Sequence, residues 1–253
     1  MPCWIRIAGL AAAVLPMVLS LAAVVTEAQV PDKFSNLQYF PKDISKQQLI
    51  GTMRGFAFAL NVRCQFCHAG KAGNSLEQMD FASDEKDTKK TARAMLRMVD
   101  AINNEYIAKM GRTAPMRVEC VTCHRRLSVP KTMNALLAET MEKKDLQAAL
   151  ALYRDLRKED LGGGQYDFGE TPLNILTESL LKQDKAREAA AIMELNVEVN
   201  TPPTGWAYHL LAQAHVANKE IDKAKADYRK ILEMNPQDQF AKKQLEELSS
   251  GKQ

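Results

Sequence analysis

Histidine and cysteine are both scarce in this sequence. The 253 residues include four histidines and five cysteines, so few side chains are available for metal binding or thiol chemistry. Charge of one sign is also lacking, because 34 basic residues stand against 31 acidic ones and leave a net charge of +3. That balance is too mild to favour a nucleic-acid partner, and no nucleic-acid-binding motif is present. The chain also lacks the βαβ pattern near which a thioredoxin-like redox pair is found.

The scarce residues are concentrated in two short motifs. These are residues 64–68 (CQFCH) and 120–124 (CVTCH), which use four of the five cysteines and two of the four histidines. The Cys-x-x-Cys-His spacing is typical of c-type haem attachment, in which two thiols bond the haem and the next imidazole binds the iron. We therefore predict two covalently attached c-type haems. The predicted haem-binding residues are Cys64, Cys67 and His68 in the first motif, and Cys120, Cys123 and His124 in the second.

Two other uses of the same cysteines compete with haem attachment. A zinc site could take all four thiolates, but it would leave the histidine after each pair without a role. Two disulfides would need no histidine at all. Both stay open as alternatives, whereas haem attachment uses every cysteine and histidine of the two motifs.

Residues 1–28 have the composition of an export signal. Arg6 precedes an apolar run from Ile7 to Val25, and Ala28 is a small residue of the kind that a signal peptidase accepts. The rest of the chain is then expected in the periplasm, on the side of the membrane where c-type haem is attached. The apolar run is also nearly long enough to remain as an uncleaved anchor in the inner membrane.

The first motif follows a predicted helix. Ser45 and Gln48 form a capping-box signature, and the apolar residues after them recur at helical spacing, which predicts a helix over 46–60. Met53 lies in this helix, 11 residues before the first motif. If the helix covers the haem face opposite His68, the Met53 sulfur could supply the sixth iron ligand; the alternative is that Met53 only packs in the core.

The second motif follows a longer predicted helix. Ser83 or Asp84 is expected to cap it, and Gly111 is expected to end it. Met95 and Met98 are three residues apart on one face of this helix. Either could meet the second iron while the other packs.

The region around the motifs resembles a known family. The matching pieces are residues 62–68, 80–84 and 120–125, and they resemble the cytochrome subunit of photosynthetic reaction centres and its bacterial relatives. The resemblance implies a multihaem cytochrome that carries electrons, as that subunit does when it re-reduces the photo-oxidised donor. It also implies distal ligation by Met53 at haem 1 and by Met98 at haem 2. This sequence has motifs for two haems, half the four of that subunit.

The chain is expected to divide into a dihaem unit over 31–130 and a helical repeat unit over 131–250. In the second unit, Ala224, Tyr228 and Pro236 fit the small, aromatic and proline positions of a tetratricopeptide repeat. A shift of 35 residues towards the N-terminus brings the first two positions onto Ala189 and Met193. The predicted helix pairs are about 133–157, 171–197 and 204–234, followed by a terminal helix from about 237.

The predicted fold is therefore all-α, a dihaem cytochrome unit followed by a short α-solenoid. The leading function is electron transfer between periplasmic or membrane redox partners, because an iron with both axial positions filled has no open site for a substrate. Solenoid repeats usually bind peptides or another subunit, so protein docking is expected. A dihaem peroxidase-like enzyme and a scaffold for a complex are the alternatives. His209 and His215, in the repeats, are expected to pack or to face solvent.

Overall fold

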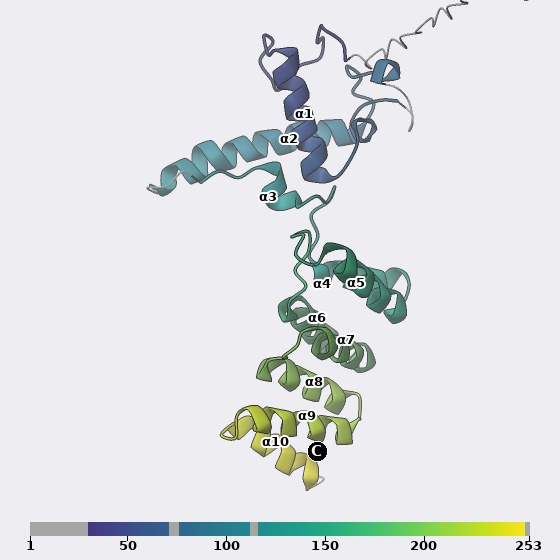
Figure 1. The fold of residues 1–253 in the computed structure, drawn as a ribbon, viewed down its shortest axis with the longest axis vertical. Helices are drawn as coiled ribbons and strands as arrows, with labels where there is room; N and C mark the ends of the chain where they lie inside the picture. The colour runs from purple at the N-terminus through teal and green to yellow at the C-terminus, as the bar shows by residue number, and fades with distance from the viewer. Residues whose placement is uncertain (1–29, 71–75, 112–115, 251–253) are drawn as a thin grey trace, which may run out of the picture.

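The computed structural model describes residues 30–70, 76–111 and 116–250, and the named elements in this part of the chain are all helical. The predicted all-α class is confirmed. The molecule is elongated, with the helices around both motifs at one end of the long axis and paired helices stacked below them (Figure 1). Within the described ranges, no helix has the length and hydropathy needed to cross a membrane. The predicted signal segment, residues 1–28, lies outside them.

The first helix, α1 (Lys46–Leu60), has the bounds that the sequence predicts. Its capping box forms, because the Gln48 N–H donates to Ser45 Oγ and the Ser45 N–H donates to Gln48 Oε1, each at 3.2 Å. Asn61 ends the helix at φ 53°, in the left-handed region that asparagine tolerates. The chain then turns into the first motif, where Cys64–Phe66 form a short 3₁₀ helix, η1.

The second helix, α2 (Asp87–Ala101), begins later than the sequence predicts. Neither Ser83 nor Asp84 caps it. Ser83 Oγ accepts from the N–H of Glu85 at 3.1 Å in a local turn, whereas the Asp84 carboxylate pairs with side chains of the helix. The predicted cap was wrong because Ser83 bonds within the loop and Asp84 pairs with Lys89 and Arg93 of the helix. Lys86 is the N-cap residue and forms no side-chain cap.

Two irregular helical turns and a glycine follow α2: η3 (Ile102–Ile107, a π-helix), η4 (Ala108–Met110) and Gly111 at φ 60°. The predicted end at this glycine is confirmed. The buried Asn103 side chain donates to the Val118 carbonyl at 2.9 Å and accepts from the Val118 N–H at 2.8 Å. Because α3 (Cys120–His124) begins two residues after Val118, these bonds attach the end of the long helix to the second motif.

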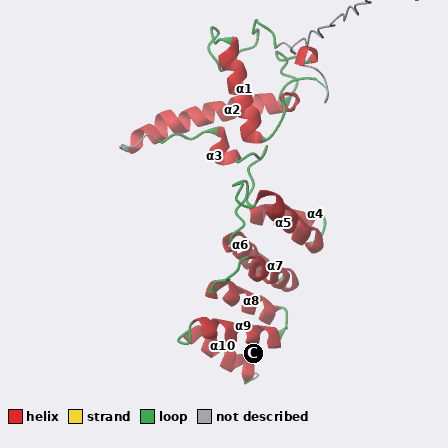
Figure 2. Cartoon of the chain, viewed as in Figure 1, coloured by secondary structure: helices red, strands yellow, loops and turns green. Residues whose placement is uncertain are grey.

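The remaining described chain forms three helix pairs and a final helix, as the sequence predicts. They are α4 (Met133–Lys143) with α5 (Leu146–Asp160), α6 (Glu170–Lys182) with α7 (Ala186–Val199), α8 (Gly205–Ala217) with α9 (Ile221–Met234), and α10 (Gln239–Ser249). Figure 2 shows them stacked in chain order with short loops between them. This is the arrangement of an α-solenoid.

The apolar core of the described chain lies almost wholly in these repeats. Ala189 and Ala224, at the small positions of the repeat, are fully buried, and so are the aromatic Tyr153 and Tyr228, at no more than 1% exposure. Small residues let the helices approach and the rings fill the remaining space. In the described part of residues 30–130, by contrast, the buried apolar side chains are Leu49, Ala59 and Met79.

Candidate functional site

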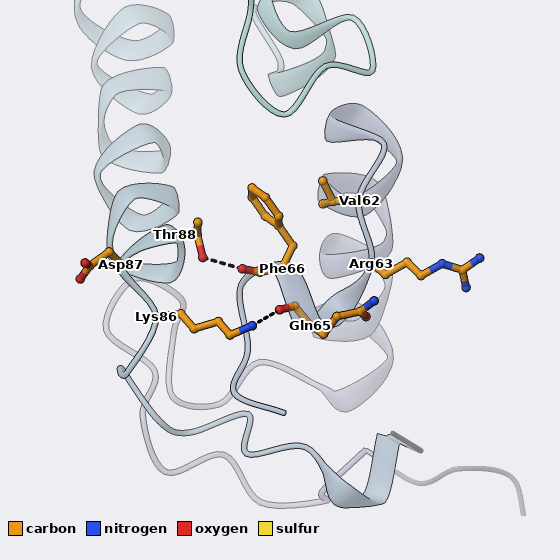
Figure 3. A pocket seen from close by; sticks show the side chains of 7 residues that line it. All are labelled: Val62, Arg63, Gln65, Phe66, Lys86, Asp87 and Thr88. Carbon is orange, nitrogen blue, oxygen red and sulfur yellow. Dashed lines mark hydrogen bonds between the residues drawn. The ribbon is translucent and has the colours of Figure 1, made fainter. Parts of the chain in front are cut away.

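The start of α2 holds the first motif in place. The Lys86 ammonium donates to the Gln65 carbonyl, and the Thr88 hydroxyl donates to the Phe66 carbonyl at 2.5 Å (Figure 3). The two carbonyls belong to the residues between the cysteines of the motif. An open depression of about 610 Å³ is lined by this loop and the start of α2, and the Phe66 side chain extends between α2 and α1 (Figure 3). Hydrogen bonds from the start of α2 thus hold the loop that carries both thiols. The depression beside the loop is open to solvent.

His68 lies in a crowded, positively charged setting. Its ring meets the Phe81 ring edge-on, with centroids 5.0 Å apart. The chain closes just after it, where the Asp80 N–H donates to the Ala69 carbonyl at 3.0 Å. Burial lowers the pKa of His68, and the nearby charge of Lys89 lowers it further. The imidazole is therefore neutral, which is the form that binds iron.

Lys89 is a buried cation beside this motif, 8% exposed. Its Nζ donates to the three successive carbonyls of residues 81–83 at 2.9, 3.0 and 2.7 Å. The Asp84 carboxylate lies 3.2 Å from Lys89 Nζ and 2.8 Å from Arg93 Nη1. The hydrogen bond from Arg93 and the Lys89 ammonium hold the pKa of Asp84 well below its usual range. The cluster is therefore charged, and it secures the loop that packs on His68.

The second motif is built differently, as the short helix α3. The Glu119 N–H donates to Thr122 Oγ1 at 3.0 Å where the helix begins. His124 Nδ1 lies 2.8 Å from the Leu127 carbonyl oxygen. A hydrogen bond at that distance assigns the proton to Nδ1 and leaves Nε2 able to bind a metal.

α1 joins the two motifs, since it leads into the first and packs against α3. The Arg126 N–H donates to the Ala59 carbonyl at 2.9 Å, and the Arg126 guanidinium lies 5.8 Å from the centroid of the Phe58 ring. Ala59 precedes Cys64 by five residues, and Arg126 follows His124 by two. Because an extended chain spans about 3.4 Å per residue, Cys64 and His124 lie within about 27 Å of each other.

The candidate methionine ligands lie on the helices that precede the motifs. Met53 is half-buried on α1, whereas Met95 and Met98 are 42% and 47% exposed on α2. Met98 is five residues from Asn103, about 7.5 Å along a helix, and Met95 is eight residues from it, about 12 Å. Asn103 is the residue attached to Val118, so Met98 lies nearer to that attachment than Met95 does.

In the described part of residues 30–130, large apolar side chains are exposed on the segments that carry, precede or follow the motifs: Phe58, Phe66, Met95, Met98, Tyr106, Met110, Met116, Val121 and Val129. Phe66 and Val121 lie inside the motifs, where a bound apolar group would cover them. A porphyrin is a large apolar group, and two thiols with a neutral imidazole are the donors that fasten haem c. The residues of both motifs therefore fit haem c.

The competing uses of the cysteines are not formed in the described part of the chain. Residues 30–70, 76–111 and 116–250 contain no group of three or more His, Cys, Asp or Glu side chains placed to hold a metal ion. The four motif cysteines form no disulfide, and burial raises the pKa of Cys67 and of Cys120. Neither a four-thiolate zinc site nor a disulfide pair is present among these residues.

The two histidines of the repeats take part in packing, as expected. His215 is 3% exposed, with Nδ1 2.6 Å from Asp227 Oδ2 and Nε2 3.3 Å from Glu194 Oε1. His209 Nε2 lies 3.4 Å from Asp238 Oδ2, and its ring packs among aromatic residues of α8, α9 and α10. Each therefore has partners within the repeats.

Sequence reasoning missed three residues that shape these sites, Lys89, Asn103 and Leu127. Asn103 lies among the apolar positions of its helix, and a polar residue there indicates a specific partner. Lys89 and Leu127 carry no comparable signal, because a buried lysine and a backbone carbonyl are recognised only from their tertiary contacts.

Fold and sites together define a class, an all-helical c-type cytochrome followed by tetratricopeptide-like repeats. The chain matches the family described as photosynthetic reaction centre cytochrome C subunit over residues 12–218, and it belongs to that family. Members of that family are cytochromes, and the family implies covalently bound haem c. A tetratricopeptide repeat matches residues 207–238, which cover most of α8 and all of α9.

Two curated relatives match part of the chain. Cytochrome c-554 of Chloroflexus aurantiacus is 34% identical over 97 residues, which are 35% of this chain and 22% of the relative. The photosynthetic reaction center cytochrome c subunit of Thermochromatium tepidum is 32% identical over 112 residues, 44% of this chain and 25% of the relative. The chain thus spans about a quarter of the length of the curated relatives it matches.

Two solved structures are similar to 47% of the chain. One is the first tetratricopeptide domain of Spaghetti (RPAP3) bound to an HSP90 peptide, at 18% identity, 89% coverage of that chain and a TM-score of 0.33. The other is the first such domain of human RPAP3, at 19% identity, 87% coverage and a TM-score of 0.32. At these scores the likeness carries no argument about what the repeats bind.

Proposed function

We propose that this chain is a dihaem c-type cytochrome of the periplasm, which passes electrons between redox proteins and docks to one of them through its repeats. One observation carries the proposal: two complete Cys-x-x-Cys-His motifs lie within about 27 Å of each other, joined through the Ala59 and Arg126 hydrogen bond. Two haems attached there would be near enough to exchange electrons inside one molecule.

The proposed ligands are those that the sequence predicts. Cys64 and Cys67 attach haem 1, with His68 and Met53 on its iron, and Cys120 and Cys123 attach haem 2, with His124 and Met98 on its iron. Attachment of Asn103 to the segment before α3 supports Met98 over Met95, because it fixes the C-terminal end of α2 beside the second motif.

Haem c, when bound, supplies an iron that gains and loses one electron. The chain's own residues hold that group and select its chemistry. Leu127 fixes the tautomer of His124, while Lys86 and Thr88 hold the loop of the first motif. Because histidine and methionine would fill both axial positions, no position stays open for a substrate, and electron transfer is favoured over peroxidase-like catalysis.

The repeats are proposed as a docking unit for a redox protein or a membrane complex. Their own core is complete without residues 30–130, so they can present a rigid surface to a partner. The proposed boundary between the units is at residues 130 and 131. Export through residues 1–28, with cleavage or retention of that segment as an anchor, would bring the chain to the periplasmic face of the inner membrane.

Haem stoichiometry tests this function. The full chain, expressed with a c-type haem attachment system, should carry the mass of two haems by intact mass spectrometry. The double variants C64A/C67A and C120A/C123A should each carry one. A wild-type chain without added haem mass, or one that binds zinc instead, would overturn the proposal.

Axial ligation is tested by a matched pair of variants on α2. M98L should remove the methionine–iron charge-transfer band of haem 2, while M95L should keep it. M53L should remove the corresponding band of haem 1. A wild-type protein in which one haem lacks this band and turns over peroxide would establish the peroxidase-like alternative.

A further inference from the structure

The buried Lys89 ammonium pairs with the half-buried Asp84 carboxylate beside the first motif. We propose that this pair raises the reduction potential of the haem at His68 above that of the haem at His124, so that the chain holds its first electron at the first motif. The inference rests on the proposed function, with haem at both motifs and the two histidines as ligands.

The two histidines differ in their hydrogen-bond acceptors. The Leu127 carbonyl accepts from His124 Nδ1 at 2.8 Å, which makes the imidazole more electron-rich and favours oxidised iron. His68 Nδ1 is buried without a partner of good geometry in the described chain. The Phe81 carbonyl does lie toward His68, but it accepts from the Lys89 ammonium at 2.9 Å. The imidazole of His68 is therefore the weaker electron donor.

Charge acts in the same direction. Lys89 is 8% exposed, so its positive charge is poorly screened by solvent and opposes the extra positive charge of oxidised iron nearby. Arg125 and Arg126, beside the second motif, are exposed, and water and salt screen them. Lys89, Arg93 and Asp84 together carry a net charge of +1, because one carboxylate faces two cations. The Asp80 carboxylate raises the pKa of His68 and so opposes them, but Lys89 and Arg93 each act on the ring more strongly than Asp80 does.

Removing each member of the pair therefore has an opposite effect. K89M takes the net charge of the three groups to zero and frees the Phe81 carbonyl for His68, and both changes lower the potential at the first motif. D84N takes the net charge to +2 and raises that potential. A purely structural role would shift the potential in one direction for both variants. No bond forms or breaks, since a single electron enters from an external reductant.

A redox titration of the full-length holoprotein, followed by absorbance, tests the proposal. C120A/C123A, which keeps only the first haem, should titrate at a higher potential than C64A/C67A, which keeps only the second. In the protein with both haems, K89M should move the higher-potential wave to a lower potential and D84N should move it to a higher one. K90M, which removes a lysine whose side chain is 55% exposed, should move neither wave.

Each result decides the matter. The reverse order of the single-haem variants, shifts of the same sign in K89M and D84N, or an equal shift in K90M would overturn the inference. If K89M does not fold or load haem, the D84N shift and the order of the single-haem variants decide. Failure of the proposed function looks different, because the wild-type mass would then lack two haems.

Discussion

The described part of residues 31–130 and residues 131–250 both consist of helices and loops, yet the two regions are held together in different ways. In the described chain, 24 of the 27 buried apolar side chains lie in the second region and three lie in the first. The first region is instead held by hydrogen bonds from side chains to the backbone, such as those from Asn103 to Val118 and from Lys89 to residues 81–83. It also leaves large apolar side chains exposed. The contrast indicates that the repeats supply their own core and that the cytochrome region takes much of its core from haem. The following predictions test that contrast.

The largest effect is expected when all four motif cysteines are replaced by alanine. Without covalent haem, the region 31–130 should lose most of its amide protection in hydrogen exchange, because little buried apolar surface remains to hold it. Peptides from 131–250 should exchange as in the wild type. Equal protection of both regions in the variant would contradict the proposed division of the core.

Shortening a buried side chain of the repeats should lower their stability and leave the haem spectra unchanged. Leu137 is fully buried in the core that α4 shares with α5 and α6, so L137A should lower the free energy of unfolding of the repeats by about 2–5 kcal/mol. I175A, at a position 49% exposed, is the control and should cost less than about 0.5 kcal/mol. Denaturant unfolding measures both, and a changed haem spectrum in L137A would contradict the separation.

A smaller and local effect is expected at the attachment of α2 to the second motif. N103A removes two hydrogen bonds and leaves the Val118 backbone groups without them, which should cost about 1–3 kcal/mol. The charge-transfer band of haem 2 should weaken while that of haem 1 is kept. Loss of both bands would show that Asn103 supports the whole region and not one site.

The smallest effect is a pH dependence of the repeats. Burial lowers the pKa of His215, but Asp227 and Glu194 raise it more, so the net pKa is above 6.5, with Glu220 adding to the rise. A raised folded-state pKa stabilises the fold fully below about pH 6.5 and loses that contribution as the pH rises through the folded value. Lys223, which pairs with Glu194 and Glu220, faces the same cluster.

Denaturant midpoints at pH 5.5 and 8.5 measure this dependence. The wild-type repeats should be less stable at the higher pH, and H215Q and D227N should each reduce that difference. An unchanged difference in both variants would place its origin elsewhere.

Local sequence was sufficient for the elements whose determinants are neighbours in the chain. Ser45 and Gln48 fix the start of α1 across three residues, and the repeat spacing of Ala189 and Ala224 places the solenoid helices. The two motifs define their chemistry by spacing alone, because both thiols and the imidazole lie on one turn. The axial methionines, the unit boundary and the export segment stay predictions.

Tertiary contacts decided the rest. The start of α2 moved to Asp87 because the Asp84 carboxylate pairs with Lys89 and Arg93 and does not cap the helix. The packing of α1 against α3 and the hydrogen bond from Arg126 to Ala59 bring the two motifs together, and the tautomer of His124 depends on one backbone carbonyl. Each of these contacts needs the folded geometry of backbone and side chains together, which neither composition nor periodicity encodes.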